Sequence, residues 1–300
     1  MVCSAEMSID STPSGTASEG PNAEQRRNWN ELSGPAWVAE SERIGAQIRG
    51  FGLPALARLQ IAAGHRALDV GCGGGETTLA LGESVGPTGS AHGVDVSRPL
   101  LDHAQEKATR AGPANVTFEL ADAQTAALPE GAFDRLFSRF GVMFFQDPLA
   151  AFINLRKALK KDARMAFACW RSMDDNPWMK VPLAAVAKHV ELPRPEPHAP
   201  GPMAFADALR TRGILERAGF REVAFESIDA PMNVGGGLDD LDETVAFMTR
   251  IGPSAGALRQ ADPEARAAAI AAIREAVSPY HGKGGVVMPA SVWVVTAVNG

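Results

Sequence analysis

The chain has 300 residues, a length for which about two domains are the usual prior. Hydrophobic residues make up 45% and charged residues 21%, which is typical of a soluble globular protein that can bury a sizeable core. The formal net charge of −6 argues against a chain built to coat nucleic acid, because such a chain presents a basic face.

Cysteine usage and hydropathy bear on the cellular setting. Cys3, Cys72 and Cys169 are odd in number and widely separated, and no C-x-x-C pair occurs, so we expect neither a disulfide framework nor a metal site. No apolar run approaches the roughly 18 residues of a membrane span. The N-terminus lacks the basic flank and apolar core of a secretory signal. We therefore expect a cytoplasmic protein.

The first 64 residues predict a tail followed by helices. Residues 1–22 are mainly Ser, Thr, Gly, Pro and other small residues, which cannot bury enough apolar surface to offset ordering, so we expect a disordered tail. Helical stretches follow over residues 23–64, and Pro35 is expected to interrupt them. Trp29 and Trp37 lie in this region, where packing is the simplest role for them.

Residues 67–78 combine a buried strand, a glycine turn and the start of a helix. Leu68 and Val70 suit a strand, the glycines let the main chain approach a ligand closely, and the helix begins at Glu76. The helix N-terminus presents unpaired N–H groups, which favours nucleotide-like ligands. A dinucleotide fingerprint requires G-x-G-x-x-G, but Glu76 stands where the third glycine should be. A carboxylate there disfavours a cofactor with a pyrophosphate.

The pattern that fits is an acidic residue at the strand end followed by G-x-G-x-G, formed by Asp69, Gly71, Gly73 and Gly75. It resembles motif I of the class I S-adenosylmethionine (SAM) dependent methyltransferases. The resemblance implies that SAM is the cofactor and S-adenosyl-L-homocysteine the product. It also implies that Asp69 holds the methionine amino group, directly or through water. N-terminal helices commonly fold over the active site in this family, which makes Trp29 and Trp37 candidates to cover it.

The second and third predicted strands lead into further carboxylates. The second ends in Asp95, and a carboxylate at this place hydrogen-bonds ribose hydroxyls in nucleotide-binding α/β folds. The third, residues 116–120, runs into Asp122 and Ala123, which the resemblance assigns to the adenine. Because the carboxyl ends of parallel strands form the ligand side of a doubly wound sheet, we expect these carboxylates and Asp69 to lie along one edge.

The fourth predicted strand, residues 133–139, is followed by an aromatic loop, residues 140–145. Methyltransferases that act on nucleobase or amide nitrogens carry an Asp/Asn-Pro-Pro-aromatic loop here, whereas this chain has Ser-Arg-Phe-Gly at residues 138–141. This departure disfavours such substrates. The aromatic loop resembles that of the small-molecule methyltransferases related to ubiquinone and menaquinone biosynthesis. We expect Phe140 to face the sulfonium, where a cation–π contribution is available.

Five strands alternate with helices over residues 65–171, which predicts a parallel sheet with right-handed crossovers. The fifth is expected over residues 165–170, after an exit turn at residues 160–163. A sixth is expected over residues 222–228 and a seventh over residues 291–298, and the resemblance implies that the seventh is antiparallel. The predicted fold is a Rossmann-like, doubly wound α/β sheet of seven strands.

Two long segments interrupt this alternation and predict lids over the ligand side. One is the proline-rich stretch over residues 172–204, with a helix around residues 183–190. The other is the connection over about residues 235–288, which is far longer than the usual 4–6 residues or so. We expect a tail followed by one methyltransferase domain over residues 23–300. This domain consists of a helical cap (residues 23–64), a SAM-binding core (residues 65–171), a lid insert (residues 172–204) and the rest of the sheet (residues 205–300).

The resemblance assigns one set of residues to the cofactor: Asp69, Gly71, Cys72, Gly73, Gly75, Thr77, Asp95, Val96, Asp122, Ala123, Arg139 and Phe140. The catalytic residues stay unknown, because methyl transfer from SAM needs orientation and desolvation and no triad. His189, Tyr280 and His281 lie in the inserts and are candidate bases, although each is also explained as a surface residue. Arg171, like Arg139, is a candidate to meet an acidic substrate or to form a scaffold salt bridge.

The resemblance therefore implies transfer of a methyl group from SAM to a small molecule, with oxygen or carbon favoured over nitrogen and no nucleic acid as partner. Two alternatives stay open. An NAD(P)-dependent oxidoreductase would use a similar sheet, but Glu76 and the antiparallel last strand argue against it. A non-catalytic SAM-binding regulatory protein would keep the same cofactor site. The acceptor, the pathway and the oligomeric state are not determined by the sequence.

Overall fold

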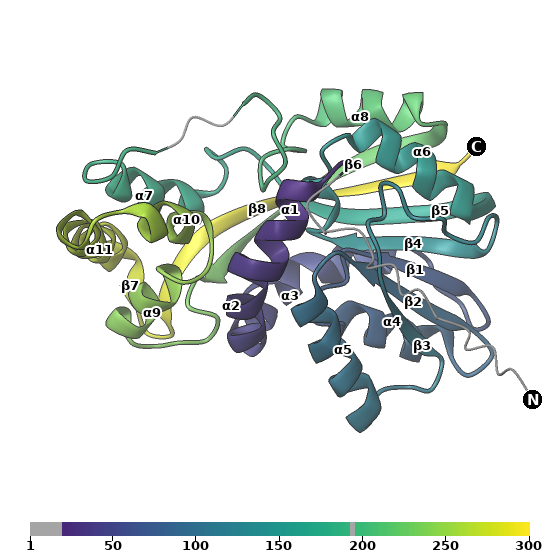
Figure 1. Cartoon of the computed structure of the whole chain (residues 1–300), viewed down its shortest axis with the longest axis horizontal. Coiled ribbons are helices and arrows are strands. Elements are labelled where there is room, and N and C mark those ends of the chain that lie inside the picture. Colours follow the sequence, from purple (N-terminus) through teal and green to yellow (C-terminus); the bar gives the residue numbers. More distant parts are fainter. Residues whose placement is uncertain (1–19, 193–195) are drawn as a thin grey trace, which may run out of the picture.

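The structure, a computed structural model, describes residues 20–192 and 196–300. Its centre is a sheet with the strand order β3-β2-β1-β4-β5-β8-β6 (Figure 1). Strands β1 to β5 pair in parallel with their neighbours, whereas β8 is antiparallel to both β5 and β6. The predicted doubly wound sheet with an antiparallel last strand is thus confirmed. The seven strands are Arg66–Val70 (β1), Ser90–Asp95 (β2), Val116–Leu120 (β3), Phe133–Arg139 (β4), Leu159–Trp170 (β5), Phe220–Asn233 (β6) and Gly285–Asn299 (β8).

Helices cover both faces of the sheet. Helices α3, α4 and α5 lie on one face and α6 and α8 on the other (Figure 1). Three of them begin with a side chain that caps the first turn, namely Ser97 for α5, Asp147 for α6 and Asp207 for α8. The central strands are buried from both sides, so Leu136 and Phe137 of β4 have no exposed surface. These helices are Ser41–Arg58 (α3), Glu76–Val85 (α4), Arg98–Ala111 (α5), Pro148–Ala158 (α6) and Ala208–Arg217 (α8).

Strand β5 begins earlier than predicted. Residues 160–163, expected as an exit turn, belong to β5. They form an irregularity in the pairing of β5 with β4, where the register shifts between Phe133 and Arg135 of β4. Phe133 pairs with Leu159, whereas Arg135 pairs with Arg164, so the intervening residues of β5 bulge away from the ladder. The prediction recognised the break in the pattern but not that the strand continues through it.

Strands β6 and β8 are also longer than predicted, and they extend past the other strands as an antiparallel ribbon. Their pairing includes Pro231 opposite Pro289 and continues to Asn233 opposite Val287. The two prolines hid this extension in the sequence, because proline removes a ladder donor and usually marks a strand end. The second insert therefore ends at Gly284 instead of about residue 288.

The inserts form a helical cluster beyond the sheet, at the left of Figure 1, where β6 and β8 reach it. The first insert contributes α7, which starts at Pro177, earlier than the predicted helix, and tolerates Pro182 in its interior. A short strand, β7, pairs with the start of β8. The cluster consists of Pro177–Val186 (α7), Leu241–Met248 (α9), Pro253–Gln260 (α10), Pro263–Val277 (α11), a 3-10 turn at Ser278–Tyr280 and His281–Gly282 (β7).

The N-terminal helices are Ala23–Arg27 (α1) and Ser33–Ala39 (α2), joined by a π-helical turn at Asn28–Leu32. Pro35 lies in the first turn of α2 and does not interrupt it, contrary to the prediction. Most of the predicted tail, residues 1–19, lies outside the described residues. Its last residue, Asn22, is 4% exposed and therefore packed, so the predicted boundary falls too late.

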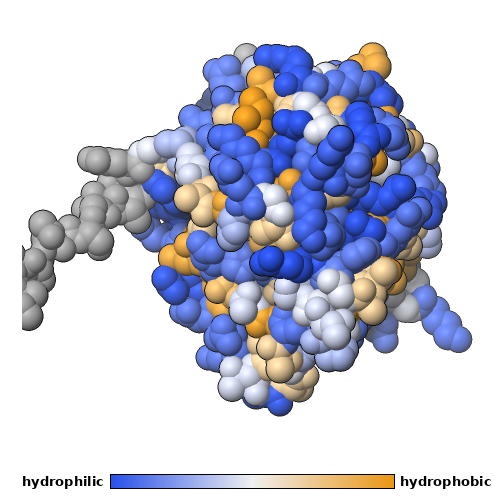
Figure 2. Space-filling view, turned by 90° about the vertical axis from the view of Figure 1, so that its right-hand side faces the viewer, coloured by the Kyte–Doolittle hydropathy of each residue, from blue (hydrophilic) through white to orange (hydrophobic). Residues whose placement is uncertain are grey.

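The two ends of the sheet differ in character. Figure 2 shows the end opposite the inserts, which is mostly hydrophilic with scattered apolar side chains. The inserts and the N-terminal helices gather at the other end (Figure 1), where parallel strands present their carboxyl ends and ligands usually bind. Within residues 20–192 and 196–300, no helix is both long and apolar enough to cross a membrane.

Candidate active site

The glycine turn between β1 and α4 forms one wall of a cavity. Gly71 has φ +66°, and a Cβ there would lie 2.6 Å from the Cα of Gly141, so only glycine fits between the two loops. Gly73 has φ +52°, and a Cβ there would meet no atom within 4 Å. Both glycines line the cavity. The turn therefore leaves open space for a ligand at Gly73 while Gly71 packs against the protein.

Asp69 lies beneath this turn and not on the cavity wall. It has no exposed surface, and its Oδ2 accepts hydrogen bonds from the hydroxyls of Thr77 (2.6 Å) and Thr78 (2.7 Å). Its Oδ1 has no partner within the described residues. Burial raises the pKa of Asp69 to about 6. Asp69 thus ties β1 to the first turn of α4, and direct contact with the methionine amino group is not supported by its position.

Cys72 completes the interior of the turn. It is 6% exposed, and burial raises the pKa of its thiol well above the ordinary value. A buried thiol of this kind is unreactive. Cys72 and Thr77 contribute to a smaller recess beside the main cavity, together with Gly73, Glu76 and Arg139.

Asp95 lines the main cavity at the end of β2. Its Oδ2 accepts from the N–H of Gly73 (2.8 Å) and its Oδ1 from the N–H of Ser97 (2.9 Å), so both neighbouring turns hold the carboxylate in place. Burial raises its pKa. Each oxygen keeps a free lone pair for a further donor, and two adjacent hydroxyls are suitable donors.

Asp122 and Ala123 line the same cavity after β3, but Asp122 already has a partner that the sequence did not predict. The side-chain amide of Asn22 donates to both oxygens of Asp122, at 2.9 and 3.0 Å, and to Oε1 of Gln124 at 3.1 Å. Asn22 also exchanges hydrogen bonds with Gln146, at 3.0 and 2.7 Å. The start of the N-terminal segment is thus fastened to the position expected to bind adenine.

The π-helical turn extends this cover along the β2–α5 turn. The amide of Asn30 donates to the carbonyl of Val96 (2.8 Å), and the hydroxyl of Ser97 donates to the carbonyl of Trp29 (2.8 Å). Trp29 and Trp37 both line the cavity, and their rings meet edge to face at 5.2 Å. The N-terminal helices therefore close one side of the cavity.

Phe140 lines the cavity and has a strained backbone conformation. Its φ of +63° is unusual for a bulky residue, and the hydrogen bond from its N–H to the carbonyl of Ala168 (3.0 Å) holds it there. Its ring stacks on Trp170 at 4.3 Å with an interplanar angle of 11°. Trp170 in turn meets Trp178 of α7 at 4.9 Å. These rings continue the wall from the core into the first insert.

Arg139, which precedes Phe140, is held by Glu76. Its Nη2 lies 2.8 Å from Oε2 of Glu76, whose other oxygen pairs with Arg49 at 2.6 Å. Burial alone would raise the pKa of Glu76, but the charges and hydrogen bonds of the two arginines lower it below the ordinary value. The carboxylate at the missing third glycine is therefore ionised and paired.

The cavity has a volume of about 330 Å³ and two chemically different parts. The first lies at the carboxyl ends of β1 to β4 and contains the glycine turn, Asp95 and Asp122. The second is formed by the inserts and α3 and is largely apolar. The sequence predicted that the inserts cover the ligand side but not which residues form this part, because these segments contain no recognisable motif. The residues are Ile44, Gln47, Ile48, Trp178, Met179, Pro182, Phe247, Met248, Arg250, Ile251, Ser254 and Arg259.

The candidate bases are not among the described residues that line the cavity. His189 is exposed in the turn after α7. His281 is exposed on β7, where its Nε2 lies 2.8 Å from the carbonyl of Asp239. Tyr280, which precedes it, is half-buried against the core. The structure therefore brings none of the three to the site.

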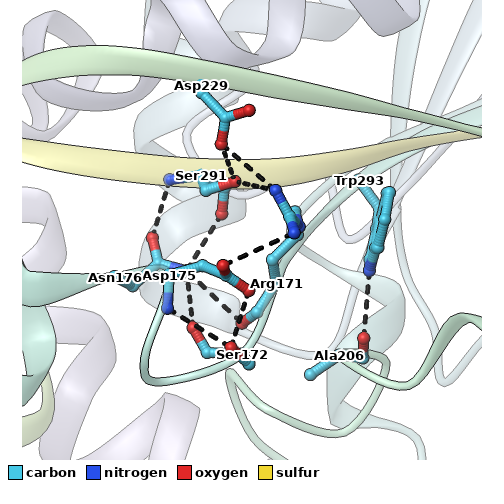
Figure 3. A network of polar contacts seen from close by, with 8 residues as sticks. All are labelled: Arg171, Ser172, Asp175, Asn176, Ala206, Asp229, Ser291 and Trp293. Carbon is cyan, nitrogen blue, oxygen red and sulfur yellow. Dashed lines mark hydrogen bonds and ion pairs between the residues drawn. The ribbon is translucent and has the colours of Figure 1, made fainter.

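Arg171 belongs to a scaffold network of polar contacts (Figure 3). It is not among the described residues that line the cavity. Its guanidinium hydrogen-bonds Asp229 (3.2 Å) and Ser291 (3.0 Å) and lies 4.6 Å from the ring centre of Trp293. Asn176, with no exposed surface, donates to the carbonyl of Ser291 (3.0 Å) and accepts from its N–H (2.9 Å). The network fixes the start of α7 to β8.

The same network positions one aromatic wall of the cavity. Nε1 of Trp178 donates to Oδ1 of Asn176 at 3.1 Å. Because Asn176 is held by β8, the indole of Trp178 keeps its orientation beside Trp170. The first insert is therefore anchored to the sheet on the cavity side.

Comparison with known proteins identifies the core. Residues 67–162 match the methyltransferase domain family. Aklanonic acid methyltransferase DauC of Streptomyces sp. (strain C5) is 33% identical over 104 residues, which are 35% of this chain and 47% of that protein. The demethylmenaquinone methyltransferase of Anoxybacillus flavithermus is 31% identical over 110 residues, 37% of this chain and 46% of that protein. The match thus spans about half the length of these curated relatives.

A solved structure extends the likeness of fold beyond the aligned core. Phosphoethanolamine N-methyltransferase 2 of Haemonchus contortus, in complex with S-adenosyl-L-methionine, has a TM-score of 0.51 at 18% identity. The likeness covers 83% of this chain and 52% of that one. At this identity it concerns the fold alone, and the sequence match of the core carries the assignment. The chain contains a methyltransferase domain of the class I, SAM-dependent type.

Proposed function

We propose that this protein transfers a methyl group from SAM to a small-molecule acceptor, and that the acceptor atom is oxygen or carbon. The observation that carries the proposal is the continuity of one cavity from the glycine turn and Asp95 to the aromatic and insert-derived wall. Such a cavity brings a cofactor site and an apolar acceptor site together, as methyl transfer requires.

The residues at the sheet edge fit SAM. Gly73 leaves room for a ligand against the backbone, and both oxygens of Asp95 are held in place to accept from ribose hydroxyls. Ala123 closes the adenine end, and Phe140 and Trp170 present aromatic surface for a sulfonium. When bound, SAM supplies an electrophilic methyl group whose bond to sulfur breaks as the bond to the acceptor forms.

The charged and titratable side chains of the wall favour an acceptor that needs no histidine base. Among the described residues that line the cavity, these groups are Asp95, Asp122, Arg139, Arg250 and Arg259. Asp95 and Asp122 already accept hydrogen bonds at the sheet edge. An acceptor that enters as an oxyanion or a stabilised carbanion needs no proton removed by the protein, and this is why we favour oxygen or carbon.

The test is methyl transfer from SAM labelled in the methyl group to a panel of small phenols, carboxylic acids, acidic carbon compounds and amines. The proposal predicts labelled products from an oxygen or carbon acceptor with wild-type protein, and loss of product with Asp95→Ala. Labelled products from amines alone would contradict the preference for oxygen or carbon. Tight binding of SAM without transfer to any of the compounds would favour a non-catalytic SAM-binding protein.

A further inference from the structure

The part of the cavity wall formed by α9 and α10 carries positive charge without a matching carboxylate. Its charged residues are Arg250 and Arg259, whereas the described carboxylates of the wall, Asp95 and Asp122, belong to the sheet edge. Arg250 is neutralised by Glu40, since its Nη2 lies 2.6 Å from Oε1. Arg259 forms no ion pair or hydrogen bond with any described residue. One guanidinium at the cavity is therefore available to a ligand.

The first turn of α10 adds unsatisfied donors at the same place. Ser254 lines the cavity and is 3% exposed, yet neither its hydroxyl nor its N–H bonds to another residue in the described parts of the chain. A hydroxyl on a cavity wall without a protein partner is free to bond to a ligand or water in the cavity.

No side chain of the described residues caps the N-terminus of α10, so these donors have no intrachain acceptor there. The N-cap is Gly252, with φ +91° and no side chain to accept from the first turn. The neighbouring helices α9 and α11 instead begin with the carboxylates of Asp240 and Asp262, which accept from their first-turn N–H groups. Gly252, Pro253, Ser254 and Ala255 all line the cavity, so the positive end of the α10 dipole faces it.

The guanidinium of Arg259 folds back towards this turn. Its Nη2 lies 3.7 Å from the place that a Cβ on Gly256 would occupy. The absence of a side chain at Gly256 lets the long arginine side chain lie along the helix. The N-terminus of α10, the Ser254 hydroxyl and the Arg259 guanidinium thus belong to the wall of one cavity, and such donors suit an oxyanion.

We propose that Ser254 and Arg259 form an anion site for the methyl acceptor, here named the α10 anion site. Because Trp178, Phe247 and Ile251 supply apolar wall to the same cavity, the acceptor is a largely apolar molecule with a carboxylate or a comparable oxyanion. This inference rests on the proposed function. It makes Ser254 and Arg259 determinants of acceptor specificity, in a segment that the sequence predicts only as a lid.

The test compares two fluorescent probes that differ in charge: the aromatic anion anilinonaphthalene sulfonate and the uncharged phenylnaphthylamine. Both are titrated into the full chain in the presence of excess S-adenosyl-L-homocysteine. Arg259→Gln and Ser254→Ala should each weaken binding of the sulfonate about tenfold, as expected for loss of a charge-assisted hydrogen bond, and leave the uncharged probe unchanged. Arg259→Lys should retain part of the affinity, because it keeps the charge without the fork of donors.

The matched control is Arg217→Gln. Arg217 is exposed in the last turn of α8, as Arg259 is in the last turn of α10, so this variant removes an equivalent surface charge. Equal losses for Arg217→Gln and Arg259→Gln would overturn the proposal, as would equal losses for both probes. Failure of the wild-type protein to bind the sulfonate better than the uncharged probe would overturn it as well.

Calorimetric titration of the same samples with S-adenosyl-L-homocysteine separates this inference from the proposed function. If the protein binds S-adenosyl-L-homocysteine but the variants affect both probes equally, only the α10 anion site is contradicted. If the variants weaken binding of the sulfonate alone but the protein does not bind S-adenosyl-L-homocysteine, the proposed function is contradicted. The α10 anion site then stands as part of an anion-binding cavity. Thermal unfolding of each variant, with midpoints close to that of the wild type, ensures that lost affinity is not lost folding.

Discussion

Replacing Asp69 by Asn should make the protein less sensitive to rising pH. Burial raises the pKa of this carboxyl from the ordinary 3.8 to about 6 in the folded protein. The folded state therefore binds the proton more tightly than the unfolded chain, and the associated stability is present at low pH and lost as pH rises through about 6. A difference of this size corresponds to about 3 kcal/mol once the group is fully ionised.

The side-chain geometry makes asparagine a suitable replacement. Thr77 and Thr78 both donate to Oδ2 of Asp69, so the single amide oxygen of Asn can accept both hydrogen bonds. The amide nitrogen would replace Oδ1, which has no partner within the described residues. Its unsatisfied donors lower the free energy of unfolding by an amount that does not depend on pH. The change of the variant–wild type difference with pH therefore reports only on the charge of Asp69.

The assay is urea unfolding of wild type and Asp69→Asn at a series of pH values. The free energy of unfolding of the variant relative to wild type should increase by about 3 kcal/mol between about pH 3 and pH 7. The exposed Asp239→Asn should show no such trend. A difference that stays flat or falls with pH would refute the reasoning, because it would mean that the ionised carboxylate has a favourable partner in the fold.

Three further outcomes are expected. Asp95→Ala should weaken SAM binding by about 1–3 kcal/mol in calorimetry without lowering the unfolding midpoint, because ribose hydroxyls lose their acceptor; unchanged affinity would remove Asp95 from this role. Gly73→Val should abolish SAM binding, since its side chain would project into the open space of the turn; wild-type affinity would contradict the placement of the cofactor. Asn22→Ala should expose the N-terminal helices to proteolysis and hydrogen exchange, because it removes the side-chain hydrogen bonds that join Asn22 to Asp122 and Gln146. Unchanged protection from both would show that packing alone holds these helices in place.

The sheet edge could be predicted from the sequence because its signals are local. Each of β2, β3 and β4 ends within a few residues of where its apolar pattern ends, and Asp95 is the last residue of β2. Glycine spacing likewise located the turn at Gly71 and Gly73. Such features depend on backbone conformation over a few residues, and single residues report on it reliably.

Asp69 shows the limit of a motif. Its position at the strand end was predicted correctly, and the resemblance implied that it holds the methionine amino group directly or through water. The structure buries it beneath Thr77 and Thr78, which does not support direct contact. Whether a carboxylate at a strand end points to the ligand or to the following helix depends on side-chain packing. The motif does not encode that choice.

The rest of the cavity could not be predicted, because it is assembled from distant segments. Asn22 meets Asp122 across 100 positions of the chain, and no local pattern links them. The α10 anion site depends on the missing side chains of Gly252 and Gly256 and on the fold-back of Arg259. Only the tertiary arrangement turns these ordinary residues into a site.

The measurement that tests the central claim most directly is calorimetric titration of the purified protein with SAM, S-adenosyl-L-homocysteine and NAD in parallel. We predict saturable binding of SAM and S-adenosyl-L-homocysteine at one site per chain and no binding of NAD, because Glu76 stands in place of the third glycine of a dinucleotide-binding turn. Binding of NAD without binding of SAM would contradict the assignment of the cavity to SAM and to methyl transfer.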